Sequence, residues 1–371
     1  MDKKKGYYIH FDARQSIGVS KKIDMQITEL GRQFYMKEIP ITAVPRSLMK
    51  RILGLFPLAS IPRDYDKVWS QMDNPDFIYM RRTVVDHDYL NFLKKIKKKY
   101  PRCKVIVEIF TYPYDKDDFG KWNAWPFYLK EIIYRRQLKK YVDRFVTYSR
   151  DKEIFGVQTI RTTNGVDLHQ IKPVTGEYSP GRVVLVGVAY MQRQHGYERL
   201  IMGLKEYYDR ANAERKVYLY LVGDGPEKEF YQKLVSLYHL QDYVKFYPTM
   251  TGKELDEVYD QADIALASFG FYKAGVYHSN SSLKVCECLA KGLPFATGCT
   301  IAGIEDTCPF MFLFPNDKSI VSIEELVNKF DQLRSQGSKL KSELAKEIRN
   351  FATEKVSMEK VMKPIIEYIN E

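Results

Sequence analysis

The chain has 371 residues, of which 45% are hydrophobic, and it carries a formal net charge of +11 at pH 7. This length accommodates two domains of ordinary size, and this hydrophobic content argues against wholesale disorder. The sequence has no run of about 18 or more apolar residues, and no apolar signal core follows Met1–Gly6, so we expect neither a membrane-spanning helix nor a secretory peptide. The five cysteines lack the spacing of metal ligands and indicate reduced thiols in a cytosolic protein.

The positive charge lies entirely in the first half of the chain. Residues 1–165 contain 33 Lys and Arg against 19 Asp and Glu, whereas residues 166–371 contain 25 against 28. Such an excess is typical of proteins that bind nucleic acid, an anionic membrane surface or a phosphate-bearing substrate. For the basic run Lys94–Lys99 we favour the simpler interpretation of a solvated helix face.

Strand-like segments alternate with helix-like segments in both halves. In the first half the pattern predicts strands over residues 7–11, 77–80, 104–110 and 144–148, and helices near 20–36, 89–100 and 124–141. After the hinge-like segment Thr163–Asp167 it predicts strands over 182–189, 216–222, 243–247 and 264–268, and helices near 197–212, 226–240 and 253–262. Alternation of this kind is typical of parallel sheets with helices on both faces. We therefore predict an α/β fold of two doubly wound, Rossmann-like domains that face a central cleft, with ligands at the carboxyl ends of the strands.

Two segments of the first half suggest contact with a ligand or a membrane. The turn Ser16–Lys22 contains Gly18, which would let backbone amides approach a phosphate or a sugar closely. The segment Arg46–Ile61 places bulky apolar residues on one side and basic residues on the other. Such a segment is typical of helices that lie in a bilayer interface, and a helix that covers the protein core is the alternative.

Acidic and aromatic residues follow two later strands of the first half. Asp86–Asp88 resembles the acidic metal-holding pair of some sugar transferases, but it precedes a helical run, so we assign Asp88 to capping that helix. The strand that ends near Glu108 is followed by aromatic and carboxylate side chains, which suit either a sugar site or ordinary packing. The candidate residues on the acceptor side are Arg81, Tyr112, Tyr114 and Asp115.

Two strand-to-helix turns of the second half carry candidate binding groups. The first turn offers Arg193 and His195 directly before a helix start, where two cationic or donor groups would lie over a diphosphate. The second turn contains Gly223 and Gly225, which permit positive φ, and Pro226, which suits the first position of a helix.

The segment Ser279–Thr297 predicts a short helix between a polar turn and a strand over Phe295–Thr297. The helix should run from Leu283 to Lys291, with Gly292 ending it and Ser281 or Ser282 as its N-cap. Its unpaired amides, with Lys284 one turn in and Glu287 just beyond, suit an anion flanked by hydroxyls. That description fits the diphosphate and ribose of a nucleotide sugar. The alternative is an ordinary surface helix with a solvated Lys–Glu pair.

Taken in order, the motifs of the second half resemble those of the GT-B glycosyltransferases of family four. The set covers residues 160–300 and consists of Asn164–Asp167, Val186-Gly187 with a helix start at Gly196, Val222–Pro226, Val244–Phe246, Leu255–Tyr259 with Ala262–Ile264, and Lys284, Glu287, Leu289, Ala290, Gly292 and Pro294. Residues 358–369 also resemble the last helix of that fold, whereas the first 150 residues resemble it only in the Gly18 turn and the strand rhythm. The chain departs from the family at Ser279, where a second glutamate is common.

The resemblance implies a retaining, metal-independent glycosyltransferase without a cofactor, whose nucleotide sugar, linked to UDP, GDP or dTDP, is a substrate. It implies an acceptor-binding domain over residues 1–164, a nucleotide-sugar-binding domain over 165–352, and a helix over 353–371 that crosses back to the first domain. Arg193 and Lys284 would be catalytic, because they would neutralise the diphosphate leaving group, and Glu287 would hold the ribose. The other candidate donor-binding residues are Gly18, His195, Gly223, Phe246, Asn280, Ser281, Ser282 and Leu283.

The basic first half and the Arg46–Ile61 segment suit a lipid-linked glycan acceptor at an anionic membrane surface. We therefore expect a cytoplasmic protein, peripheral at the inner face of the cell membrane, that builds a capsule, an exopolysaccharide or a lipopolysaccharide. A nucleotide-sugar epimerase or a non-catalytic sugar-nucleotide-binding protein of the same fold is the alternative. We expect no nucleic-acid partner, because no aromatic stacking motif is interleaved with the basic residues.

Overall fold

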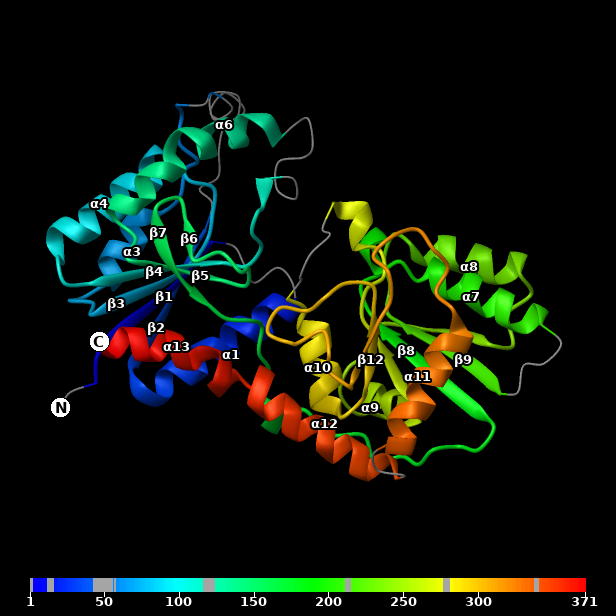
Figure 1. The fold of residues 1–371 in the computed structure, drawn as a ribbon. Helices are drawn as coiled ribbons and strands as arrows, with labels where there is room; N and C mark the ends of the chain where they lie inside the picture. The colour runs from blue at the N-terminus through cyan, green and yellow to red at the C-terminus, as the bar shows by residue number, and fades with distance from the viewer. Residues whose placement is uncertain are drawn as a thin grey trace. The chain divides into compact units, whose positions relative to one another are not determined.

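The computed structural model describes residues 3–11, 17–42, 56, 58–115, 124–210, 215–275, 281–336 and 340–371 (Figure 1). Contacts divide the chain into two compact units, Met1–Thr163 with Val361–Glu371 and Asn164–Lys360. The segment 353–360, which we had grouped with the crossing helix, therefore lies in the second unit. Each unit is an α/β body with helices on both faces of one sheet, which confirms the predicted fold class.

The sheet of the first unit has the order β2-β1-β3-β4-β5-β7-β6. Neighbouring strands run parallel, except that β6 and β7 form an antiparallel hairpin at one edge. The strands are β1 (Lys5–Phe11), β2 (Tyr35–Ile41), β3 (Phe77–Arg81), β4 (Lys104–Ile109), β5 (Arg144–Thr147), β6 (Glu153–Ile154) and β7 (Val157–Arg161). Figure 1 shows α1 and α13 on one face and α4 and α6 on the other. The helices are α1 (Ile17–Gln33), α3 (Tyr65–Gln71), α4 (His87–Lys99), α6 (Trp125–Tyr134), the 3-10 helix η3 (Arg135–Lys140) and α13 (Met358–Asn370).

The sheet of the second unit is parallel throughout and has the order β10-β9-β8-β11-β12-β13. The strands are β8 (Arg182–Val188), β9 (Lys216–Val222), β10 (Val244–Tyr247), β11 (Ile264–Leu266), β12 (Phe295–Thr297) and β13 (Met311–Leu313). The helices are α7 (Glu198–Asp209), α8 (Lys228–Leu237), α9 (Gly252–Gln261), α10 (Leu283–Lys291), α11 (Ile323–Gln336) and α12 (Lys341–Val356), with 3-10 helices η4 (Leu168–Gln170), η5 (Arg193–His195) and η6 (Phe271–Ala274). This is the strand order of dinucleotide-binding folds. The order in which successive strands are added to the sheet reverses between β8 and β11.

The second strand of the first unit differs from the sequence prediction. The helix predicted near 20–36 ends at Gln33, and β2 begins two residues later in parallel register with β1. Between them, Phe34 is buried and packs edge-on against Phe77 of β3. Pro40 is tolerated in β2 because this strand is the edge of the sheet, where a missing N–H costs little.

The N-terminus of α4 is capped by Asp86, so our assignment of the cap to Asp88 is wrong. Asp86 Oδ1 accepts from the Tyr89 N–H at 2.9 Å, and Asp86 Oδ2 accepts from the Ile61 N–H at 2.7 Å. The buried Asp86 also pairs with Arg63 at 3.4 Å, whereas Asp88 is exposed. The cap is the residue that still has extended backbone before the helix, and that residue is Asp86.

A buried ion-pair network lies near the carboxyl ends of β3 and β4. Glu108 Oε1 accepts from Lys22 Nζ at 2.7 Å, and Glu108 Oε2 accepts from Arg81 Nη1 at 3.2 Å. The Tyr148 hydroxyl also donates to Glu108. Burial alone would raise the pKa of Glu108, but the two cations and these hydrogen bonds lower it to about 2. The network ties α1 to the end of the sheet and keeps all three charged side chains inside the first unit.

The predicted amphipathic segment Arg46–Ile61 lies mostly outside the described residues, and so does Asn280. In the parts of the chain that the structure describes, no helix has both the length and the apolar character that a membrane span requires. The same parts contain no cluster of His, Cys, Asp and Glu side chains that could hold a metal ion.

Candidate functional site

The two loops that leave the second sheet at its reversal point contact each other. The loop after β8 contains η5, and the loop after β11 contains η6. The Phe269 N–H donates to the His195 carbonyl at 2.8 Å, and the Gly270 N–H donates to the Gln194 carbonyl at 3.1 Å. In folds of this order, ligands bind outside the carboxyl ends of the strands at this point. The contact therefore builds one wall of the candidate site.

Two glycines permit this close backbone approach. Gly196 has φ of 63°, and a Cβ there would lie 2.6 Å from the Gly270 nitrogen. A Cβ on Gly270 would lie 2.5 Å from the Arg193 carbonyl oxygen. Since all of these neighbours are backbone atoms, no side-chain movement could make room. The positions of η5 and η6 therefore depend on both glycines.

Lys284, in the first turn of α10, places its amine against the buried side chain of Tyr197. Lys284 Nζ donates to the Tyr197 hydroxyl at 3.0 Å and lies 5.4 Å from the centre of its ring. Burial lowers the pKa of the Lys284 amine to about 8. Among the described residues, no carboxylate forms an ion pair with this amine, and the charge of Glu287, one turn further along α10, only partly offsets the effect of burial. A desolvated cation without an ion-pair partner at a helix start is suited to bind an anionic ligand.

His195 is held as a neutral hydrogen-bond donor. Burial, with Lys284 acting in the same direction, lowers the pKa of its imidazole to about 3. The Gln192 N–H donates to His195 Nδ1 at 2.9 Å, so the proton of the neutral ring lies on Nε2. The sequence left open whether His195 acts as a cation or as a neutral hydrogen-bond donor. The structure supports the neutral donor.

Arg193 occupies the same loop but is far more exposed than Lys284. Its side chain is 83% exposed, and Arg193 Nε lies 3.6 Å from Glu227 Oε1. An exposed pair of this kind is weak and easily exchanged for another anion. Arg193 is therefore available to a ligand at this edge of the sheet, at the cost of one surface contact.

The turn between β9 and α8 supports the η5 loop from behind. A Cβ on Gly223 would lie 2.0 Å from the Ala189 carbonyl oxygen, and Met191 N–H donates to the Asp224 carbonyl at 2.5 Å. The Glu227 N–H in turn donates to the Met191 carbonyl at 3.1 Å. Gly223, which we expected to contact the donor, is therefore required first for packing between these two loops.

The start of α10 is anchored by Asn164 of the hinge-like segment. The Asn164 N–H donates to Ser281 Oγ at 2.7 Å, and its side-chain amide donates to the Ser281 carbonyl at 2.9 Å. Ser282 is the N-cap, but its side chain makes no cap hydrogen bond. We expected the hydroxyl of the N-cap serine to accept a hydrogen bond from a backbone amide in the first turn of the helix. For Ser282 this expectation is wrong. Glu287 lies one turn further along α10, half-buried.

The remaining predicted donor residues lie at different places. Gly18 is exposed in the first turn of α1. Phe246, on β10, is half-buried against the core of the second unit. The second unit therefore brings Arg193, His195 and Lys284 to one edge of its sheet, whereas Phe246 lies two strands away from β8.

The predicted acceptor-side residues are largely engaged inside the first unit. Arg81 is 5% exposed and Tyr114 is 2% exposed. The Tyr114 hydroxyl donates to Glu131 Oε1 at 2.7 Å, while Asp115 accepts from Arg135 at 2.6 Å. The ring of Tyr112 packs edge-on against Tyr114 and Phe155. These side chains shape the end of the sheet, and their contact with an acceptor stays a prediction.

Two residues of the site were not assigned a role from the sequence. Tyr197 was treated only as part of a helix start, and Asn164 only as part of a hinge-like motif. The sequence places both residues beside recognisable motifs, since Tyr197 directly follows Gly196 and Asn164 begins the Asn-Gly-Val-Asp segment. Neither partner could be inferred, because Lys284 and Ser281 are more than 80 residues away in the chain.

Comparison with known proteins finds a family similarity in the second unit. Residues 180–333 match the family model described as glycosyl transferases group 1. The matched residues include Arg193, His195 and Lys284, so the candidate site lies within the part of the chain that is similar to this family. No curated protein matches the chain at the level of sequence.

Solved structures show the GT-B fold over the whole chain. A glycosyltransferase from Rickettsia africae aligns with a TM-score of 0.64 at 12% identity, covering 100% of this chain and 98% of that one. HepE (Alr3699) from Anabaena, solved in complex with UDP, aligns with a TM-score of 0.63 at 14% identity, covering 99% of both chains. The lipopolysaccharide outer core galactosyltransferase WaaB aligns with a TM-score of 0.59 at 13% identity, covering 99% of this chain and 100% of that one.

The loop contact makes a prediction about Gly196→Ala. The new Cβ would clash with backbone atoms and separate η5 from η6, so we expect a nucleoside diphosphate, with UDP as the probe, to bind at least about tenfold more weakly and the melting temperature to fall. Titration calorimetry and thermal unfolding measure the two effects.

Gly181→Ala is the matched control. Gly181 also has positive φ, 75°, but a Cβ there would meet no atom within 4 Å. This variant should lose about 1 kcal/mol of stability from backbone strain and keep its affinity for UDP. Equal UDP affinities for Gly196→Ala and Gly181→Ala would contradict the loop contact as a determinant of the site.

The lowered pKa of Lys284 makes a second prediction. Below about pH 8 the free amine is protonated and attracts a diphosphate, and above it the charge is lost. Because binding an anion raises this pKa, the affinity for UDP should fall by about tenfold between pH 7 and pH 9. Calorimetry across this range tests the expectation. Lys284→Arg stays charged throughout, so a decline of the same size in that variant would assign the effect to another group.

Proposed function

We propose that this chain is a glycosyltransferase that moves a sugar from a nucleotide-sugar donor to a glycan acceptor with retention and without a bound metal. The observation that carries the proposal is the desolvated Lys284 amine at the start of α10, whose loss of hydration the nearby Glu287 charge offsets only in part. A nucleoside diphosphate supplies the missing negative charge. The UDP in the HepE complex, a structure of the same fold, supports this choice of ligand class.

In the proposed reaction, the bond between the anomeric carbon of the sugar and the β-phosphate oxygen breaks, an acceptor hydroxyl oxygen bonds to that carbon, and the hydroxyl proton passes to the leaving phosphate. The electron pair of the broken bond leaves with the nucleoside diphosphate, so negative charge builds up on the β-phosphate. Lys284 lies where this charge is stabilised at low local dielectric, and His195 Nε2–H and the free amides of α10 add neutral donors. Arg193 exchanges Glu227 for the phosphate, and Glu287 holds the ribose hydroxyls.

The proposed acceptor is a lipid-linked glycan at an anionic membrane surface, as in the synthesis of a capsule, exopolysaccharide or lipopolysaccharide. Structural similarity to WaaB, a lipopolysaccharide galactosyltransferase, supports this pathway class. So does α6 of the first unit, which has an exposed apolar face. The exposed side chains on it are Trp125, Leu129, Ile132 and Ile133, at 53%, 36%, 42% and 43%.

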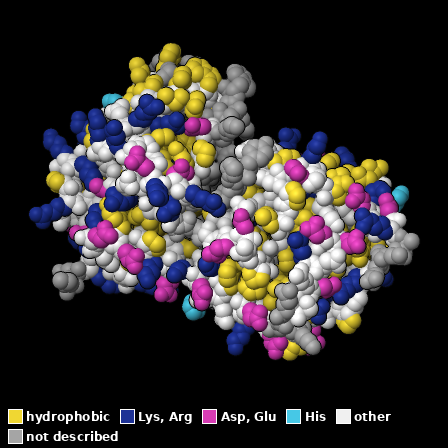
Figure 2. All heavy atoms as spheres, in the orientation of Figure 1, with side chains coloured by type: hydrophobic (Ala, Val, Ile, Leu, Met, Phe, Trp, Pro, Cys, Tyr) yellow, Lys and Arg dark blue, Asp and Glu magenta, His cyan; other side chains and the backbone are white. Residues whose placement is uncertain are grey.

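The face of α6 fits a bilayer interface better than a protein core. Figure 2 shows hydrophobic side chains gathered over this helix, and further hydrophobic patches among basic and acidic side chains elsewhere on the face drawn. Directly after α6, η3 exposes Arg136, Lys139 and Lys140. A helix with bulky apolar residues on one face and basic residues beside it is typical of interfacial attachment to anionic lipids. The Arg46–Ile61 segment, of which we expected the same role, lies mostly outside the described residues.

Catalytic substitutions test the transfer reaction. UDP-, GDP- and dTDP-sugars are first screened for hydrolysis or transfer. With the active donor, Lys284→Ala should lower kcat about a hundredfold, because one lost contact to developing charge is worth about 3 kcal/mol. Arg193→Ala should lower it only about tenfold, because its charge is largely exposed to water. Glu287→Ala should mainly weaken nucleotide binding.

Lys253→Ala is the control for these variants, since Lys253 is 90% exposed on α9. Melting temperatures of all variants should match the wild type. Wild-type turnover in Lys284→Ala would refute the assignment of that residue. Rearranged nucleotide sugar as the product, or bound donor without any product, would instead identify an epimerase or a non-catalytic binding protein.

Vesicle flotation tests the membrane contact. The wild-type chain should float with vesicles that contain phosphatidylglycerol at low salt, and Leu129→Ser/Ile132→Ser should remain at the bottom, because the variant buries less apolar surface in the interface. The matched control is Phe230→Ser/Leu237→Ser, which removes two exposed apolar side chains from α8 of the second unit. Flotation of the α6 variant at the wild-type level would remove α6 as the contact.

A further inference from the structure

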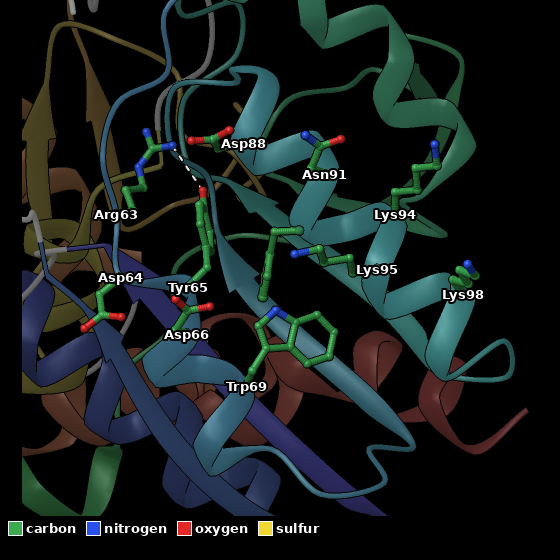
Figure 3. Close-up of a pocket in the computed structure, with 11 residues that line it drawn as sticks. Arg63, Asp64, Tyr65, Asp66, Trp69, Asp88, Asn91, Lys94, Lys95 and Lys98 are labelled. Atoms are coloured by element: carbon green, nitrogen blue, oxygen red, sulfur yellow. Dashed lines mark hydrogen bonds between the residues drawn. The ribbon is translucent and has the colours of Figure 1, made fainter.

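A cavity in the first unit lies apart from the ion-pair network and from α6. Its volume is about 610 Å³, within the range of pockets that hold small ligands. Figure 3 shows it between α3 and α4, with side chains from both helices directed toward it. The lining residues are Arg63, Asp64, Tyr65, Asp66, Trp69, Asp88, Asn91, Phe92, Lys94, Lys95 and Lys98.

One wall of the cavity is aromatic and rigid. Tyr65 stacks on Phe92 with ring centres 4.7 Å apart, and Trp69 packs edge-on against Phe92 at 5.8 Å. Arg63 fixes the Tyr65 hydroxyl at 3.3 Å and is itself held by the Thr83 hydroxyl and the Val84 carbonyl. Tyr65 and Trp69 nevertheless remain partly exposed. Partly exposed rings fixed by their neighbours form a flat apolar platform whose ordering costs little on binding.

The opposite wall is polar and rich in lysine. Asp88, Asn91, Lys95 and Lys98 follow one another at helical spacing on one face of α4, with Lys94 beside them. In Figure 3, the Lys95 side chain crosses the cavity toward the aromatic wall. Acidic groups are present as well, since Asp66 and Asp88 are exposed at the rim.

The basic run Lys94–Lys99, which we had interpreted as a solvated helix face, contains lysines that contact protein groups and lysines that do not form ion pairs. Lys97 pairs with Asp143 and donates to the Cys103 carbonyl at 2.8 Å, and Lys99 lies 5.7 Å over the Trp69 ring. In the described part of the chain, Lys94, Lys95 and Lys98 form no ion pair, although Asp66 and Asp88 line the same cavity. Three unpaired ammonium groups around one cavity favour an anionic ligand.

We infer that this cavity binds an acidic segment of a glycan, built from sugars that carry a carboxylate or a phosphate. The C–H face of a pyranose ring lies on the Trp69 and Tyr65 platform. Its acidic group meets the lysines of α4, and its hydroxyls donate to Asp66 and Asp88 and accept from Asn91. If the chain has the proposed function, the cavity holds part of a growing acceptor glycan. This role rests on the proposed function, whereas the binding of an acidic glycan does not.

A glycan fits this cavity better than a lipid surface does. The aromatic rings are recessed between two helices and cannot enter a bilayer, in contrast to the protruding side chains of α6. Sugar hydroxyls, on the other hand, are suitable partners for carboxylates beside an aromatic platform.

Two oligosaccharides of one linkage and length test the inference on the full chain. One is a β-1,4-linked glucuronic acid hexamer, and the other is cellohexaose, which has the same backbone without carboxylates. The acidic hexamer should bind about tenfold more tightly in titration calorimetry. Lys94→Gln/Lys95→Gln/Lys98→Gln should remove this preference, and Trp69→Ala should weaken both ligands. All variants should bind UDP as the wild type does.

The matched control removes the same charge elsewhere in the first unit. Lys37→Gln/Lys152→Gln/Lys363→Gln changes three exposed lysines outside the cavity and should leave binding of the acidic hexamer within about twofold. Since the lysine variant of the cavity changes only exposed side chains, it tests the site even if Trp69→Ala fails to fold.

Several results would overturn the inference. They are no binding of the acidic hexamer, equal binding of the two hexamers, wild-type binding by the cavity variant, and loss of vesicle flotation as the main effect of that variant. Failure of the donor site is separable, because loss of UDP binding by the wild type would contradict the proposed function and leave the glycan result unchanged.

Discussion

The backbone contact between η5 and η6 is the constraint on which the candidate site depends. It positions Arg193 and His195 at the reversal point of the second sheet, and it places Tyr197 beneath them as the partner of Lys284. Gly196 and Gly270 make the contact possible because neither leaves a side chain between the two backbones. The site is therefore built from loop backbone that the sheet holds in place, and its charged side chains are positioned as a consequence.

The two units treat buried charge in opposite ways. In the first unit, the single carboxylate of Glu108 pairs with both Lys22 and Arg81, so each of these buried cations has an anionic partner inside the protein. In the second unit, Lys284 is desolvated while, among the described residues, no carboxylate forms an ion pair with it. A buried cation without an ion-pair partner lowers the free energy of unfolding, and binding of an anion beside it raises that free energy again. This contrast is the physical reason for placing the diphosphate in the second unit and for treating the Glu108 network as structural.

Local patterns were enough to predict much of the second unit. The boundaries of α10 and β12 were predicted correctly, because Gly292 and Pro294 end the helix and a short apolar run follows. What the sequence did not reveal depends on contacts between distant residues. The edge strand β2, the short helix α3 and the β6–β7 hairpin are stabilised by pairing and packing across the first unit, and their local patterns are weak. The same holds for the site, where the spacing indicated Lys284 but not its contact with Tyr197.

The most direct test of the account is a crystal structure of the chain with bound UDP. We predict that the diphosphate lies at the start of α10, with a phosphate oxygen within hydrogen-bond distance of Lys284 Nζ and of an amide in the first turn of that helix. A diphosphate bound away from Lys284 and α10 would contradict the central claim.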